Sequence, residues 1–224
     1  MPVRLITAAV SDAGAHRPTN QDAAFAASWG AAVADGVGGG PSGDLASAAL
    51  VHRLVATRGG GLDADGLLVR IREANWDIRA HVERDPALEG MATTFTGIFL
   101  STTGDLLLAH TGDSRAYLLR DGELSRETRD DSYVQALVDH GIIPPEAAAA
   151  HPRRNIITAS LGGAEGDVVS VAERPATAGS CAVTGSPTTC PKPTSRVSSP
   201  TPTIRARQLR PPWPSHSRRG RATT

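Results

Sequence analysis

The sequence predicts an α+β fold in which antiparallel strands form layers and helices pack against them. Short strand-like segments come in pairs that are joined by tight turns. Two longer segments carry apolar residues at the three- and four-residue steps of an amphipathic helix. Strands and helices do not alternate in a regular βαβ order, which argues against a doubly wound parallel sheet.

The N-terminal part of the chain predicts strands followed by a helix. Arg4–Val10 is an apolar run with β-branched residues, which favours a strand. Ala23–Trp29 and Ala31–Ala34 are short apolar runs on either side of a glycine and predict a hairpin. Pro41–Thr57 repeats alanine, leucine and valine at helical spacing, and Ser42 is a suitable N-cap.

The middle of the chain predicts a long helix and then two hairpins. Asp63–Val82 carries leucine, isoleucine and tryptophan at helical steps. Thr93–Leu100 and Asp105–His110 flank a Thr-Gly turn. Arg115–Leu119 and Glu123–Arg126 flank an Asp-Gly turn, which is a strong hairpin signal. These local pairs predict antiparallel sheets.

The remaining elements are short, and a tail follows them. Ser132–His140 and Pro145–Ala150 have helical character, and Asp167–Glu173 alternates like a strand. We place the folded body at residues 1–178. We expect residues 179–224 to be a disordered, basic tail rich in proline, serine and threonine, because so few large apolar residues bury too little surface to offset chain entropy.

The net charge of zero hides an asymmetry between body and tail. All 23 acidic residues lie at or before Glu173, whereas eight of the 23 basic residues follow Arg174. The acidic body is not expected to bind nucleic acid, but it can hold divalent cations. Both cysteines, Cys181 and Cys190, lie in the tail, so the body has no disulfide framework and no cysteine-based zinc site.

The sequence favours a cytoplasmic protein with no membrane partner. No run approaches the roughly 18 consecutive apolar residues of a membrane helix. Met1–Val10 lacks the long apolar region and the cleavage site of a signal peptide. We also expect a monomer.

Five polar clusters are candidates for chemistry. They are Ser11–Asp22, Ala34–Gly39, Gly90–Thr94, His110–Arg115 and His151–Asn155. Each also has a structural interpretation. Arg17 and Asp22 suit a surface ion pair, Asp35 suits the start of a tight turn, and Asp113 suits a polar bend between strands.

The glycine-rich turn after Ala34 also invites comparison with a nucleotide-binding turn. Pro41 stands where the third glycine of a dinucleotide site belongs, and the region that should hold a second strand is helical. The only lysine is Lys192, so a Walker P-loop is excluded. We therefore do not expect nucleotide binding.

Taken in order, the clusters resemble the metal-dependent serine/threonine protein phosphatases of type 2C, the PPM family, in their bacterial form. The matching motifs are Gly14…Arg17-x-x-Asn20-Gln21-Asp22, Ala34-Asp35-Gly36-x-Gly38-Gly39, Ala92-Thr93-Thr94, Gly112-Asp113-Ser114-Arg115 and His151-Pro152-x-Arg154-Asn155. The resemblance covers about residues 5–175. It implies a four-layer α-β-β-α sandwich, in which two mainly antiparallel sheets are flanked by helices, and hydrolysis of phosphoserine and phosphothreonine in signalling.

The resemblance also implies a site for two Mn²⁺ or Mg²⁺ ions. Asp35 would bridge the ions and Gly36 would offer its backbone carbonyl, since hard ions prefer oxygen ligands. Asp113 matches a position associated with a third, weaker ion in bacterial members. The ions would activate a water for in-line attack on phosphorus.

The same resemblance assigns residues to the water and to the phosphate. Asp22 would orient the water. Gln21, which we count with the metal site, stands where many members have glutamate and adds no charge. Arg17 would hold the substrate phosphate with its two-pronged guanidinium. The partners would be proteins phosphorylated by serine/threonine kinases.

The resemblance stops in the tail. The family completes its site with two further aspartates, and no acidic residue follows Glu173. A shifted reading frame after Gly179 permits Gly-Asp-Gly-Leu-Thr, so we expect that a frame change removed the C-terminal part of the domain; a genuine tail is the alternative. The chain is then an active phosphatase, an inactive truncated relative that binds phosphoproteins or another partner, or an interaction protein that uses its basic tail.

Limited digestion with trypsin tests the predicted tail. Cleavage is expected first between Arg196 and Arg221, because prolines remove hydrogen-bond donors there and few apolar residues are available to fold the segment. Mass spectrometry of the early fragments identifies the order of cleavage. Early cuts in the body, with Arg196 to Arg221 intact, would contradict the expectation.

Overall fold

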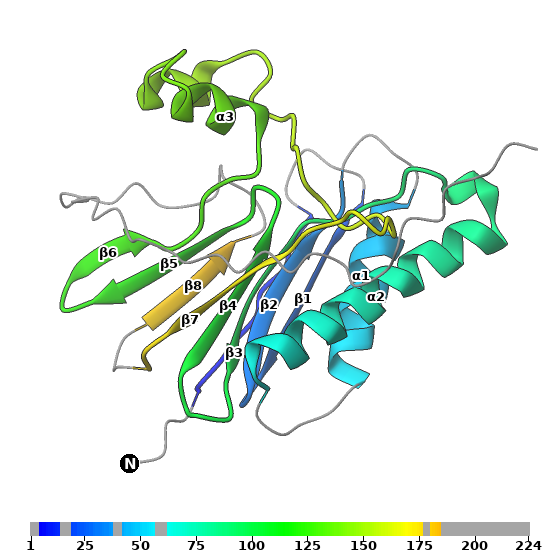
Figure 1. Cartoon of the computed structure of the whole chain (residues 1–224), viewed down its shortest axis with the longest axis horizontal. Coiled ribbons are helices and arrows are strands. Elements are labelled where there is room, and N and C mark those ends of the chain that lie inside the picture. Colours follow the sequence, from blue (N-terminus) through cyan, green and yellow to red (C-terminus); the bar gives the residue numbers. More distant parts are fainter. Residues whose placement is uncertain (1–4, 14–18, 38–41, 57–61, 177–179, 185–224) are drawn as a thin grey trace, which may run out of the picture.

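Two antiparallel sheets form the body of the protein (Figure 1). The computed structural model describes residues 5–13, 19–37, 42–56, 62–176 and 180–184. The larger sheet has the order β1-β2-β3-β4-β7, with strands Asp22–Ala27, Gly30–Asp35, Phe95–Leu100, Leu106–Thr111 and Ser170–Arg174. The smaller sheet has the order β6-β5-β8, with strands Glu123–Arg126, Arg115–Arg120 and Ser180–Thr184.

Two helices cover one face of the larger sheet (Figure 1). Helix α1 spans Gly43–Ala56 and helix α2 spans Ala64–Arg84. The side chain of Asp63 caps α2 by accepting a hydrogen bond from the Gly66 amide. Their apolar faces pack on the sheet to form the main core, so the opposite face of the larger sheet is left to meet β5 and β8 of the smaller sheet.

Stacked and tilted aromatic rings fill the core between α1, α2 and the larger sheet. Phe99 lies 6.1 Å from Phe25, 6.1 Å from Trp29 and 6.3 Å from Phe95, measured between ring centroids. Gly30 leaves room for this group, because a Cβ atom there would lie 2.7 Å from the Phe99 ring. The neighbouring strand therefore approaches the ring more closely than any side chain would allow.

A small lobe stands apart from the two sheets (Figure 1). It contains helix α3, Tyr133–Asp139, and the 3₁₀ helix η2, Pro145–Ala150. The Ser132 side chain caps α3 by accepting from the Gln135 amide. A second 3₁₀ helix, η1, spans Pro86–Leu88 after α2.

The predicted α+β class and the antiparallel sheets flanked by helices are confirmed, including both hairpins of the larger sheet and the hairpin of β5 and β6. The part of the chain that the structure describes shows one helical layer and two sheets of the expected four-layer sandwich. Pro145–Ala150 is 3₁₀ rather than α-helical.

The prediction of a strand at Arg4–Val10 is wrong for the described residues 5–10, which join neither sheet. Thr7 touches β1 through a hydrogen bond from its hydroxyl to the Ala27 carbonyl, at 3.0 Å. Ile6 is 94% exposed and Val10 is 92% exposed. Apolar, β-branched composition favours a strand only where a partner strand completes the hydrogen bonds.

The predicted end of regular structure at residue 178 is also wrong. Ser180–Thr184 forms β8 and pairs with Arg115–Leu119 of β5. Apolar and polar residues do not alternate clearly in this short segment, so its pairing with β5, which is distant in the chain, is what makes it a strand. The predicted disorder of residues 185–224 concerns residues that lie outside the described part of the chain.

Replacement of Phe99 by alanine tests the aromatic core. The free energy of unfolding should fall by about 3–5 kcal/mol, because a fully buried ring leaves a cavity among rigid neighbours. Val69→Ala on the exposed face of α2 is the control and should change it by no more than about 0.5 kcal/mol. Denaturant unfolding measures both, and equal small losses would show that the rings do not form the main core.

Candidate active site

The polar clusters meet at one edge of the larger sheet because its strands are antiparallel. β1 begins, β2 ends, β3 begins and β4 ends at this edge. It carries Gln21–Asp22, Asp35–Gly36, Thr93–Thr94 and Gly112–Ser114. Four of the clusters seen in the sequence therefore become neighbours, although Gln21 and Ser114 lie 93 residues apart in the chain.

Two carboxylates face each other across the first hairpin. Asp22 and Asp35 are directly opposed in the register of β1 and β2. Phe25 of β1 is buried against the helices, so alternation places both aspartates on the other face of the sheet. Opposed side chains on antiparallel strands have Cβ atoms about 5 Å apart, and like charges there are destabilising. A cation bound between the two carboxylates would offset this repulsion.

The turn after β2 is held tightly by backbone hydrogen bonds. The Gly36 amide donates to the Gln21 carbonyl at 3.1 Å, and the Thr94 amide donates to the Asp35 carbonyl at 2.9 Å. A Cβ atom on Gly36 would lie 2.4 Å from the carbonyl of Gly43 in α1. Only glycine fits between the sheet and the first helix at this place.

Asp113 lies in the turn between β4 and β5. Gly112 has a φ of 101°, and its amide donates to the Asp131 carboxylate at 3.0 Å. Burial raises the pKa of the Asp113 carboxyl above its ordinary value, and the nearby charge of Asp130 adds to the rise. A cation beside Asp113 would offset both effects.

An ion-pair cluster next to this turn was not predicted from the sequence. Asp130 is buried, receives bonds from the Arg115 guanidinium at 2.6–3.2 Å, and also pairs with Arg126. The cluster ties the segment before α3 to strand β5. No local spacing rule joins Arg115 to an aspartate fifteen residues later, so the sequence offered no signal for it.

His110 is a buried histidine behind the turn, on the face of β4 opposite the helices. Its Nε2 donates to the Arg129 carbonyl at 2.9 Å, so in the neutral ring Nδ1 accepts from the Thr96 hydroxyl at 2.9 Å. Burial lowers the pKa of His110 below its ordinary value. The imidazole acts here as a neutral bridge rather than as a metal ligand.

The fifth polar cluster lies away from the sheet edge. Arg17 is outside the described part of the chain. The cluster at His151–Asn155 belongs to the lobe, where the His151 ring lies 6.0 Å from that of Tyr133 and the Arg153 guanidinium lies 5.6 Å from it. These contacts give the cluster a structural role within the lobe.

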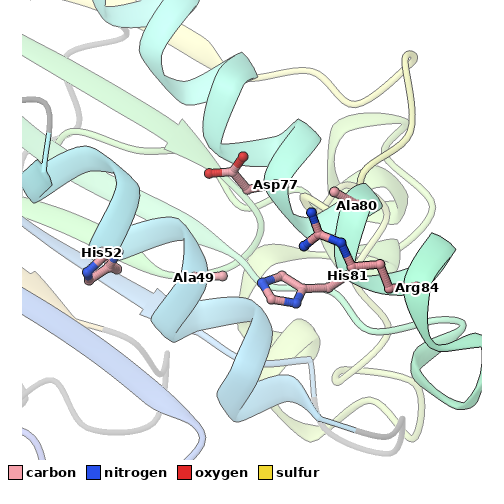
Figure 2. A pocket seen from close by; sticks show the side chains of 6 residues that line it. All are labelled: Ala49, His52, Asp77, Ala80, His81 and Arg84. Atoms are coloured by element: carbon pink, nitrogen blue, oxygen red, sulfur yellow. The ribbon is translucent and has the colours of Figure 1, made fainter.

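A hollow of about 260 Å³ on the helical layer is a different surface (Figure 2). It is lined from α1 and α2 by Ala49, His52, Asp77, Ala80, His81 and Arg84. The imidazoles of His52 and His81 stand apart in Figure 2. None of the candidate residues at the sheet edge contributes to it.

The residues at the edge fit a divalent cation in part. Asp35, Asp22 and the Gly36 carbonyl are oxygen donors of the kind that Mn²⁺ and Mg²⁺ prefer. Within the described residues, however, no group of three histidine, cysteine, aspartate or glutamate side chains converges to hold a metal. The described residues of the edge therefore offer oxygen donors that a cation could use, but they do not form a complete binuclear site.

The chain belongs to the protein phosphatase 2C family, whose model matches residues 15–140. A serine/threonine protein phosphatase, PstP of Mycobacterium tuberculosis, is 48% identical over 162 residues, which are 70% of this chain and 31% of that protein. A serine/threonine phosphatase of Listeria welshimeri, stp, is 37% identical over 137 residues, 58% of this chain and 54% of that one. The matched part of the chain thus spans 31% of the first relative's length and 54% of the second's.

Solved structures show the same fold. The crystal structure of the serine/threonine phosphatase PstP/Ppp of Mycobacterium tuberculosis has a TM-score of 0.71 and 42% identity, over 78% of this chain and 75% of that one. The catalytic domain of PstP in complex with two manganese ions has a TM-score of 0.66 and 41% identity, over 75% and 72%. Among the described residues, no helix is both long and apolar enough to cross a membrane.

The buried histidine makes stability depend on pH. The fold keeps His110 neutral, so the unfolded chain takes up a proton first as the pH falls below the ordinary pKa of 6.5. The neutral His110 therefore contributes its full share to the free energy of unfolding above pH 6.5. This share is lost as the pH falls from 6.5 to the lowered pKa of His110 in the folded state. His110→Asn should reduce this loss while costing about 1–3 kcal/mol at pH 8.

Urea unfolding between pH 8 and pH 5 measures the effect. His52→Gln, on the exposed side of α1, is the control and should leave the pH dependence unchanged. An unaltered slope in His110→Asn would mean that other groups cause the loss of stability in acid.

Proposed function

We propose that the sheet edge is the catalytic site of a metal-dependent protein phosphatase that hydrolyses phosphoserine and phosphothreonine. The opposed carboxylates of Asp22 and Asp35 carry the proposal, because they create a cation site beside a rigid turn. The names of the relatives support the substrate class. Phosphorylated proteins of kinase signalling in the cytoplasm are the proposed substrates, and a monomer is the proposed state.

Each candidate residue has a proposed task. Asp35 and the Gly36 carbonyl hold Mn²⁺ or Mg²⁺, with Asp113 at a weaker position. When bound, the ions lower the pKa of a water and stabilise charge on the phosphoryl oxygens.

Further residues act on the water and on the substrate. Asp22 and Gln21 orient the water by accepting its hydrogen bonds. Arg17 binds the phosphate group, for which the geometry of its guanidinium is suited.

One observation favours the alternative of a catalytically inactive relative that binds phosphoproteins or another partner. No acidic residue follows Glu173, and the described residues assemble no three-ligand metal group. The affinity of hard ions follows the number and charge of their ligands, so a site with few carboxylates binds them weakly. We therefore propose the phosphatase site for the family fold and weak metal binding for this chain.

Hydrolysis of p-nitrophenyl phosphate at millimolar Mn²⁺ separates the two possibilities. The chain as it stands should show negligible turnover, and a chain with the shifted frame restored after Gly179 should be active. In the restored chain, Asp35→Asn should abolish activity and Arg17→Ala should lower kcat/KM by about 10²–10³-fold, because a charge-assisted contact to the phosphoryl group is lost.

Asp121→Asn is the matched control for the loss of a carboxylate. Asp121 lies in the β5–β6 hairpin, at the far end of β5 from the site, and its φ of 51° suits asparagine. It should keep full activity. Turnover in the present chain with two tightly bound Mn²⁺ ions would show that the site is complete without further aspartates.

A further inference from the structure

The threonine pair at the start of β3 has no task in the proposed chemistry, yet both residues lie at the site. Thr93 is fully buried and Thr94 is 2% exposed. A buried hydroxyl needs a partner, because leaving it unpaired costs free energy. The partners of Thr94 are the two segments that carry the candidate metal ligands.

On one side, Thr94 binds both backbone polar groups of Asp35. Its amide donates to the Asp35 carbonyl at 2.9 Å, and its hydroxyl accepts from the Asp35 amide at 3.1 Å. The Thr93 hydroxyl adds a bond to the same carbonyl at 3.1 Å. The peptide groups on either side of the Asp35 Cα are therefore fixed, and with them the direction in which its side chain leaves the backbone.

On the other side, Thr94 holds the turn that carries Asp113. Its hydroxyl lies 2.8 Å from that of Ser114, within hydrogen-bond distance. Its methyl group packs over Gly112, where a Cβ atom would lie only 2.6 Å from it. One side chain thus connects Asp35 to the residues on both sides of Asp113.

We infer that Thr94 is a positioning residue that fixes Asp35 relative to Asp113 and thereby sets the affinity of the sheet edge for a divalent cation. The inference rests on the proposed function, since it assumes that Asp35 is a metal ligand. Hydrogen-bond partners behind the ligands of a metal orient them, and their loss costs about 10–100-fold in affinity.

A purely structural role for Thr94 makes a different prediction. If its hydroxyl only satisfies a buried amide, its removal lowers the free energy of unfolding and leaves cation binding unchanged. Thr128 provides the comparison, because it is also buried and its hydroxyl accepts from the Ala116 amide at 3.0 Å. The Thr128 hydroxyl thus satisfies a buried amide of the smaller sheet, as that of Thr94 does in the larger one, but it makes no hydrogen bond to Asp35.

Mn²⁺ titration of the full chain, followed by the electron paramagnetic resonance signal of free Mn²⁺, tests the inference without any need for turnover. Thr94→Val should weaken binding by about 10–100-fold. Thr94→Ser keeps the hydroxyl and should restore most of the affinity. Thr128→Val should lose a similar amount of stability in urea unfolding but keep the affinity of the unaltered chain.

Ser114→Ala is a second test of the inference, to be used if the Thr94→Val protein does not fold. It removes the Ser114 hydroxyl that lies 2.8 Å from the Thr94 hydroxyl, leaves Thr94 itself unchanged, and should weaken binding in the same direction. Equal Mn²⁺ affinity in Thr94→Val, Ser114→Ala and Thr128→Val would overturn the inference and leave the proposed function in place. Two outcomes would overturn the proposed function and this inference together. One is that the unaltered chain binds no Mn²⁺, and the other is that Asp35→Asn binds Mn²⁺ as strongly as the unaltered chain does.

Discussion

The register between β1 and β2 is the constraint on which the site depends. Phe25, Ala32 and Ala34 face the helices and are buried, so the alternating residues, including Asp22 and Asp35, face the other way. A slip of one residue would move the aromatic ring to the outer face and the carboxylates into the core. The apolar core thus fixes the position of the charged residues, although it makes no contact with a substrate.

Two kinds of interaction meet at the sheet edge and serve different purposes. Neutral hydrogen bonds from Thr93, Thr94 and Gly36 define the backbone around Asp35 with distances of 2.9–3.1 Å. The carboxylates of Asp22 and Asp35, opposed in the strand register, and that of Asp113 bring negative charge to the same edge. A scaffold that is stable by itself can hold like charges together, which is the usual arrangement of a site prepared for a cation.

Local patterns made part of this structure predictable. The hairpins follow from alternating apolar residues around turn glycines, and the helices follow from their apolar spacing, so both could be read from short windows. Strand β8 and the failure of Arg4–Val10 to join a sheet depend on partner strands far away in the chain, which no window contains. The ion pair of Arg115 with Asp130 is non-local in the same way. The candidate ligands were found through their order in the chain, but their convergence depends on strand pairing.

The hydrogen bonds described for Asp35 join its backbone groups to Thr93 and Thr94 and do not use its carboxylate. β8, at Ser180–Thr184, pairs with β5 beside the turn that carries Asp113. Geometry and affinity are therefore separable in this fold. Strand pairing and the threonines set where Asp35 lies, whereas the number of carboxylates sets how strongly a cation binds. A chain can keep the first property and lack the second, because backbone hydrogen bonds at the edge do not require the cation to form.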